Sequence, residues 1–307
     1  MTLYENKICE DAGRLKRKIE PMKVYDRRTR EYEEITQYGQ EKLRFLYGNV
    51  FGRVLLKIVV SPAVSRLYGV LNDRKSSAGK IPGFIEENHI RMEDFDDREY
   101  VSFNDFFTRK LRDGARNIER NKDILISPAD AKLLVYKIDD DLRIDVKGRT
   151  YSVDEILADD KYSKEYSGGT CLVYRLCMDD LHRYCFIDNG RLKARRTIKG
   201  KLHTVSSLSK DHKIYKENFR VVNVMDTENF GRVIHIEVGA LLVGKIINHD
   251  IRNFSKGDEK GYFEPGGSTI IQMFKKDVVK IDEDIMAQSL EGIETKVLYG
   301  EGVGTRC

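Results

Sequence analysis

Residues 257–269 read GDEKGYFEPGGST, and the apolar run IIQMF follows at residues 270–274. Two consecutive glycines lead directly into Ser268. Glycine adopts backbone angles that other residues avoid, so a serine behind such a turn can press its hydroxyl against the preceding carbonyl group. The pattern predicts a strand over residues 268–274 and makes the Gly267–Ser268 bond a candidate for self-cleavage. Taken alone, however, the tetrapeptide is more typical of an ordinary turn between strands.

Composition indicates a soluble globular chain of one or two domains. Of its 307 residues, 40% are hydrophobic and 34% are charged, which allows a sizeable core. We expect no secretory signal in residues 1–18, which are charged, and no spanning helix. The five cysteines are Cys9, Cys171, Cys177, Cys185 and Cys307. They contain no Cys-x-x-Cys pair, which indicates reduced thiols in a cytoplasmic protein and argues against a metal site.

The N-terminal region is basic and contains an amphipathic pattern. The first 80 residues carry 17 Lys and Arg against 10 Asp and Glu, and residues 1–38 are expected to form an irregular or β-like arm. Apolar residues recur at helical spacing over residues 40–60, and Pro62 ends the pattern before a second helical piece over 63–71. Two interpretations remain open at this point: a helix lying in a membrane interface, or a helix packed on the protein's own core.

The order of elements predicts an α+β fold. Residues 75–80 read as a loop, residues 81–118 look partly helical, including 103–111, and strands dominate from residue 124 onward. Helices followed by strands argue for α+β rather than a doubly wound sheet. The predicted strands cover residues 131–138, 170–176, 183–187, 219–224, 233–238, 240–247 and 268–274.

Three polar residues could assist a backbone-cutting serine. A serine hydroxyl is a weak nucleophile that needs a base, and the base needs an orienting group. Asp130 follows a Ser-Pro turn, and His182 and His203 each lie beside a predicted strand. Each has an ordinary alternative, because a lone aspartate after Ser-Pro is often a turn residue and a lone histidine is often a packed or surface side chain.

The ordered blocks of the chain resemble the phosphatidylserine decarboxylase family. From about residue 100 to the end, the matching blocks follow one another in the family's order. They are SFNDFFTRKL at 102–111, SPAD at 127–130, KGRTYS at 147–152, LHRY at 181–184, VGALLVG at 238–244 and GGST at 266–269. The ordered series is far more specific than any single block.

The resemblance implies a self-made cofactor. Ser268 would attack the Gly267 carbonyl, and the chain would split into a β chain (1–267) and an α chain (268–307) with a pyruvoyl group at position 268. That group would form a Schiff base with the substrate amine, as pyridoxal phosphate does in other decarboxylases, so no metal and no pyridoxal phosphate is expected. Residues 101–307 would form the β-rich decarboxylase core, and residues 1–100 the basic, helical membrane-docking region.

The sequence departs from the family at one position of the site. By resemblance, Asp130 orients or activates the base for self-cleavage, and His182 is the first histidine of a His-x-x-His pair tied to decarboxylation. The second position of that pair, usually the relay histidine, is Cys185 here. A thiol has an unperturbed pKa of about 8.5 and serves as a base only when activated. Cys185, His182 and His203 therefore remain candidates for the base, with His182 favoured.

The implied partner is a phosphatidylserine-containing membrane. We expect peripheral attachment at the cytoplasmic face of the cell membrane through residues 40–60, association of the α and β chains, and a homodimer as a further expectation. No nucleic-acid-binding motif accompanies the basic arm. Competing interpretations are a pyruvoyl decarboxylase of a soluble amino acid and a non-catalytic lipid-binding relative.

Overall fold

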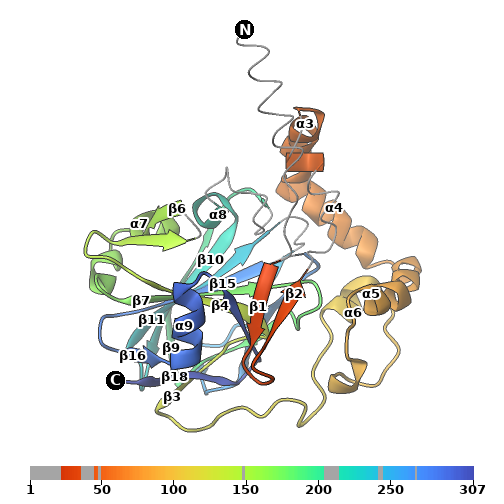
Figure 1. Ribbon diagram of the computed structural model, residues 1–307. Coiled ribbons are helices and arrows are strands. Elements are labelled where there is room, and N and C mark those ends of the chain that lie inside the picture. The colour runs from red at the N-terminus through yellow and green to blue at the C-terminus, as the bar shows by residue number, and fades with distance from the viewer. Residues whose placement is uncertain are drawn as a thin grey trace, which may run out of the picture.

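The computed structural model shows a mixed α+β protein with a β-rich body, from which helices α3 and α4 project (Figure 1). This agrees with the predicted fold class. The structure describes residues 22–35, 45–47, 50–146, 149–203, 214–240, 245–266 and 268–307.

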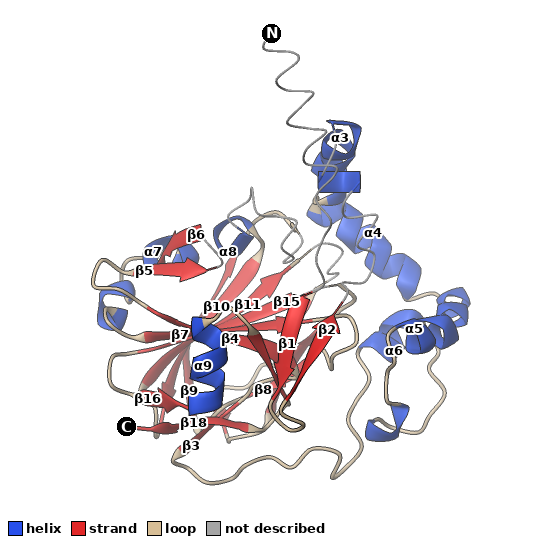
Figure 2. Ribbon diagram, in the orientation of Figure 1, coloured by secondary structure: helices blue, strands red, loops and turns tan. Residues whose placement is uncertain are grey.

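A ten-stranded sheet forms the centre of the body (Figure 2). Its order is β13-β9-β10-β11-β15-β7-β4-β17-β1-β2, and every neighbouring pair is antiparallel except β1 with β17. In chain order these strands are β1 (Met22–Asp26), β2 (Glu31–Ile35), β4 (Ala131–Lys137), β7 (Thr170–Leu176), β9 (Gly190–Ile198), β10 (Arg220–Thr227), β11 (Arg232–Gly239), β13 (Asn253–Phe254), β15 (Ser268–Phe274) and β17 (Glu294–Val297).

Strand β15 lies in the middle of this sheet. It has the predicted bounds, and all seven of its residues are buried. A strand covered on both faces is expected to be apolar almost throughout rather than alternating, which explains the run at residues 270–274. Strand β15 pairs with β7 along its whole length and with β11 from Ser268 to Met273, so its first residue, Ser268, lies at the edge of a well-paired core.

Three smaller sheets surround the central one. They consist of β12 (Ile246–Asn248), β14 (Glu259–Phe263) and β8 (Arg183–Cys185); of β16 (Val279–Ile281), β18 (Gly302–Arg306) and β3 (Ile124–Ile126); and of β5 (Arg143–Val146) with β6 (Arg149–Ser152). The sheet β12-β14-β8 matters most for the site, because β14 leads into the turn before Ser268 and β8 follows the loop that carries His182.

Short helices complete the described part of the chain. The α-helices are α3 (Val50–Val59), α4 (Pro62–Asn72), α5 (Ile81–Glu87), α6 (Phe103–Phe107), α7 (Val153–Leu157), α8 (Ile214–Glu217) and α9 (Glu283–Leu290), and the 3₁₀ helices are η1 (Lys75–Lys80), η2 (Met92–Asp94) and η3 (Ser163–Tyr166). Helix α9 packs on β4, where the Val135 amide donates to Ser289 Oγ at 3.0 Å.

The helix expected over residues 40–60 is described only in part, since 40–44 and 48–49 lie outside the described residues. The described part forms α3, and the break falls at Ser61, whose side chain accepts from the Ala63 amide at the start of α4. Pro62 is the first residue of α4, a position where its missing N–H costs nothing. The outer face of the two helices exposes large apolar side chains: Phe51, Val54, Leu55, Ile58, Leu67, Val70 and Leu71.

Two local predictions were wrong. Residues 75–80 form η1 rather than a loop, because the Ser77 hydroxyl shares its proton between the Asn72 and Arg74 carbonyls and closes a tight turn. The helix expected over 103–111 ends at Phe107. The hydroxyl of the next residue, Thr108, donates a hydrogen bond to the Asn104 carbonyl at 2.9 Å.

Other strands differ from the expected bounds. The strand expected over 183–187 ends at residue 185, and of the strand expected over 240–247, residues 241–244 lie outside the described residues. The N-terminal arm forms the β1–β2 hairpin, which the sequence indicated only as β-like. Two further parts of the predictions lie outside the described residues. They are the basic residues 14–18 of the N-terminal arm and residues 147–148, which begin the KGRTYS block.

Candidate active site

Ser268 lies between two strands that leave its hydroxyl enclosed. It pairs with Gly239 of β11 on one side and with Leu176 of β7 on the other. The side chain is fully buried, and its Oγ has no hydrogen-bond partner within the described part of the chain. A buried hydroxyl without a partner is costly by about 1–3 kcal/mol and calls for an explanation.

The turn before Ser268 requires glycine at one position. Gly266 has φ of 141°, a region that residues with a side chain rarely adopt. At Gly266 the turn therefore uses a backbone angle that favours glycine, as the glycine pair in the sequence led us to expect. Gly267, the other side of the predicted cleavage site, lies outside the described residues.

His182 lies in the loop between β7 and β8, fully buried against the ring of Phe107 at a centroid distance of 4.2 Å. Its Nδ1 is 3.0 Å from the Asp180 carbonyl oxygen. Because a carbonyl only accepts, Nδ1 carries the proton and the lone pair of the neutral ring resides on Nε2. Nε2 is buried and makes no hydrogen bond of ordinary geometry among the described residues.

The imidazole of His182 is held neutral. Burial, together with the charge of Arg109, lowers its pKa to about 3, although the backbone groups of Asp180 and Gly266 and the charge of Asp179 partly offset these effects. The effect of Gly266 places the imidazole beside the turn that leads into Ser268. With a pKa of about 3 the neutral imidazole is a weak base at neutral pH, so it accepts a proton only in a step that stabilises the imidazolium.

Asp130 immediately precedes β4 and is buried. Its carboxylate accepts from Arg116 Nη2 at 2.8 Å and Nε at 3.3 Å, and from the Tyr299 amide at 2.7 Å. The hydrogen bonds of Asp130 among the described residues thus go to Arg116 and Tyr299, not to His182 or Cys185. Arg116 was missed by the sequence analysis, since nothing in its loop signals a partner 14 residues away.

Cys185 is fully buried on β8, with its Sγ 3.9 Å from the Ser127 carbonyl oxygen. Burial raises the pKa of the thiol to about 12, although Tyr299 partly counteracts this. At neutral pH the group is therefore a neutral thiol. This argues against Cys185 as the base that activates Ser268.

His203 lies near the same end of the central sheet. Its carbonyl accepts from Asn218 Nδ2, which also donates to the carbonyl of Gly239, the residue opposite Ser268. The imidazole Nδ1 is 3.3 Å from the Tyr47 hydroxyl. The structure therefore keeps His203 in the neighbourhood of Ser268, and the segments 204–213 and 241–244 between them lie outside the described residues.

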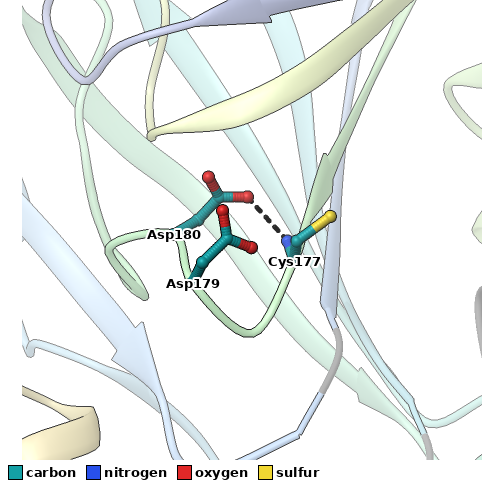
Figure 3. Close-up of side chains that lie close together, drawn as sticks. All are labelled: Cys177, Asp179 and Asp180. Carbon is teal, nitrogen blue, oxygen red and sulfur yellow. Dashed lines mark hydrogen bonds between the residues drawn. The ribbon is translucent and has the colours of Figure 1, made fainter. Parts of the chain in front are cut away.

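One group of possible metal ligands occurs among the described residues, formed by Cys177, Asp179 and Asp180 (Figure 3). Asp180 accepts from the Cys177 amide at 2.7 Å. The buried Lys132 ammonium lies 2.7 and 2.8 Å from the two Asp180 oxygens and 3.6 Å from Asp179, and Arg175 donates to Cys177 Sγ. Two protein cations already neutralise this cluster, so it does not fit a metal ion.

Comparisons with known proteins agree with this architecture. Residues 103–305 match the family model described as phosphatidylserine decarboxylase. A "phosphatidylserine decarboxylase proenzyme 2" of Clostridium acetobutylicum is 52% identical over 283 residues, covering 92% of this chain and 97% of the relative. Proenzymes of the same name from Ruminiclostridium cellulolyticum and from Clostridium botulinum strain Alaska E43 are 43% and 41% identical, covering 92% and 93% of this chain and 97% and 99% of the relatives.

These matches show the class of protein, which is a decarboxylase of phospholipid metabolism that is made as a proenzyme. The chain belongs to the phosphatidylserine decarboxylase family.

Proposed function

We propose that this chain cuts itself between Gly267 and Ser268, converts Ser268 into a pyruvoyl group, and then decarboxylates phosphatidylserine to phosphatidylethanolamine. The relatives' names support the substrate and the proenzyme state. The observation that carries the proposal is the buried Ser268 hydroxyl, which has no partner among the described residues and follows the Gly266 turn, where the backbone meets the neutral His182.

The cleavage chemistry needs only this chain's own atoms and water. Ser268 Oγ attacks the Gly267 carbonyl carbon, the peptide C–N bond breaks, and an ester joins the two residues. Loss of the Ser268 α-proton then breaks the ester Cβ–O bond, which leaves a carboxylate on Gly267 and a dehydroalanine at position 268. Water hydrolyses its enamine nitrogen, releasing ammonia and leaving a ketone. When formed, the pyruvoyl group supplies the electron sink for loss of CO₂.

His182 is the residue we assign to proton transfer. Its Nε2 lone pair lies on the side of the ring left unpartnered, and its Nδ1 is fixed on the Asp180 carbonyl. In this role His182 takes the Ser268 proton during cleavage and returns a proton to the substrate carbon in turnover. Cys185 is disfavoured by its raised pKa, and His203 remains the alternative base.

Asp130 acts in this proposal as a positioning residue. It joins Arg116 to the backbone of Tyr299, and Tyr299 belongs to the segment 268–307 that becomes the α chain. Since the two products of cleavage share this contact, Asp130 helps keep the site assembled after the chain is cut.

The two chains have many further contacts that would hold them together. Strand β15 is hydrogen-bonded between β11 and β7, and β17 between β4 and β1. Arg27 binds Asp282 at 2.8 Å and Asp284 at 2.9 Å. Dissociation would break the centre of the sheet, so the α and β chains are expected to stay associated. A homodimer stays a prediction.

Membrane attachment is proposed through α3 and α4, at the cytoplasmic face of the cell membrane. The exposed Phe51, Ile58 and Leu67 form part of their apolar outer face, at 85%, 58% and 60% exposure, and Lys57 adds a positive charge. None of the helices in the described part of the chain has the length and apolar character needed to cross a bilayer. An apolar face with a basic flank suits a helix lying in the interface. On this view, residues 1–100 remain the proposed docking region and residues 101–307 the proposed core.

A vesicle assay tests the substrate and the docking face together. CO₂ release is expected from phosphatidylserine vesicles and not from free serine, and Phe51→Ser with Ile58→Ser should reduce co-sedimentation with the vesicles. The matched control is Leu290→Ser, which removes an equally exposed apolar residue (81%) from α9. Release from free serine alone would favour a soluble-substrate decarboxylase, and equal loss of binding in Leu290→Ser would remove the docking role from α3.

A further inference from the structure

Arg109 follows α6 and is, with Arg220, one of the two largest fully buried side chains among the described residues. Its guanidinium stacks over Phe95 at 4.3 Å and Phe106 at 4.9 Å. Nη2 donates to the Asp179 carbonyl at 3.1 Å and approaches that of Asp180 at 3.4 Å. Nε and Nη1 have no partner within the described part of the chain. A buried cation with two unpartnered nitrogens is costly unless an anion joins it.

Arg220 shows what a purely structural buried arginine looks like in the same molecule. It is also buried, and burial lowers the pKa of both guanidinium groups to about 10. Yet every nitrogen of Arg220 is used: Nε binds the Ile156 carbonyl, Nη1 those of Lys216 and Asn218, and Nη2 that of Glu155. The unpartnered nitrogens of Arg109 are therefore not a general property of buried arginines in this fold.

The carboxylates near Arg109 are already engaged. Asp130 binds Arg116, and Asp179 and Asp180 bind Lys132. Their charges favour the protonated guanidinium, but none of the three carboxylates is hydrogen-bonded to it in the described structure. Arg109 is left with no ion-pair partner among the described residues.

Arg109 also lies beside the reacting groups. The Asp180 carbonyl accepts from His182 Nδ1 at 3.0 Å and lies 3.4 Å from Arg109 Nη2. The positive charge of Arg109 acts on His182, and the backbone of Gly266 acts on the same imidazole. An anion bound at Arg109 would thus lie in the neighbourhood of His182, whose ring also meets the backbone of Gly266.

We propose that Arg109 is the oxyanion-binding residue of this site, with Nε and Nη1 free to receive a carboxylate or phosphate oxygen. The inference rests on the proposed function, which supplies two sources of the same chemistry. One is the anionic serine phosphate headgroup of the substrate, and the other is the carboxylate that cleavage releases on Gly267. Guanidinium groups bind both kinds of oxyanion well.

Titration with inorganic phosphate tests the binding, using the cleaved wild type and the uncut Ser268→Ala variant at matched ionic strength. Phosphate should raise the melting temperature, since a ligand of the folded state stabilises it. Arg109→Gln should abolish the shift, whereas Arg220→Lys should keep it. A shift in both forms assigns the site to the substrate anion, and a shift in the uncut form alone assigns it to the Gly267 carboxylate. No Arg109-dependent shift in either form overturns the proposal.

Kinetics provide a second test that does not depend on Arg109→Gln folding. Arg109→Lys keeps the charge but removes the fork of donors. If the substrate anion binds here, KM for phosphatidylserine should rise about 10- to 100-fold, the range expected for losing a hydrogen bond to a charged group. If Gly267 is the ligand, the rate of chain splitting should fall instead. Unchanged values for both, in a protein that still cuts itself, refute the role of Arg109 and leave the proposed function intact. A wild type that never splits refutes the proposed function itself.

Discussion

Two buried polar regions on the same sheet are built in opposite ways. Around Glu237, the buried Lys260 ammonium contacts both the Glu237 carboxylate and Asn248, while Asn223 donates to Glu237 at 2.8 Å. Burial alone would raise the pKa of Glu237, but Lys260 and His235 lower it to about 2. Each charge in this network has a partner of opposite sign.

Around Ser268, by contrast, several buried polar groups have no partner in the described part of the chain. Ser268 Oγ and two nitrogens of Arg109 are buried without partners among the described residues, and His182 Nε2 makes no hydrogen bond of ordinary geometry there. Leaving such groups unsatisfied costs about 1–3 kcal/mol each. Isolated buried atoms without a hydrogen bond occur elsewhere in the described structure, as at His235 Nε2, but around Ser268 they belong to groups that can exchange a bond, a proton or a ligand. The Glu237 network fixes the fold, and the Ser268 region holds the chemistry.

The largest effect on the chemistry of the Ser268 region is expected from a substitution of His182. We expect His182→Ala to slow chain splitting, CO₂ release or both by about 10²- to 10⁴-fold, the usual contribution of a proton-transferring group. Time-resolved intact mass would follow the splitting. The matched control is His249→Ala, which removes a partly exposed histidine bound to Glu259 at 2.7 Å. Full splitting and normal turnover in His182→Ala would remove this residue from the mechanism.

Breaking the satisfied network should change stability rather than chemistry. Lys260→Met leaves Glu237 charged and buried, which should lower the free energy of unfolding by about 3–5 kcal/mol. The double variant Lys260→Met/Glu237→Leu should recover most of that loss. Urea unfolding in the Ser268→Ala background measures both. A double variant as unstable as the single one would contradict the pairing.

The pH dependence separates the two regions further. The folded pKa of His182, about 3, lies below the unfolded value of about 6.5, so the unfolded chain binds the extra proton first. The buried, neutral His182 therefore does not lower the free energy of unfolding above pH 6.5. As pH falls from 6.5 toward 3, the free energy of unfolding should decrease by up to a few kcal/mol. Unfolding of uncut His182→Gln should therefore be less acid-sensitive than that of the uncut parent. Equal acid sensitivity would show that His182 is not held neutral.

The smallest effect is expected at Cys185. Because its thiol is neutral at the site, Cys185→Ser should split at a rate within about twofold of wild type, far less than the loss expected for a base. A loss of 100-fold or more would restore Cys185 as the relay group.

The sequence predicted the strands that carry the site better than the site itself. The strands at 170–176 and 268–274 have the predicted bounds, because their apolar runs reflect burial on both faces. Strand β9 was missed, since exposed Arg191, Lys193 and Arg196 hide its pattern.

The sequence alone could not show which residues of the site contact one another. The engagement of Asp130 with Arg116 and the neutral state of His182 depend on which loops meet in space. Arg109 stood inside a recognised block, yet only its unpartnered nitrogens distinguish it from the equally buried Arg220.

Intact mass spectrometry of the purified protein tests the central claim most directly. The wild type should appear as two chains, residues 1–267 and residues 268–307 with a pyruvoyl group in place of Ser268, and Ser268→Ala should remain a single chain. A wild type that stays whole, or a fragment 268–307 that begins with an intact serine, would contradict the account.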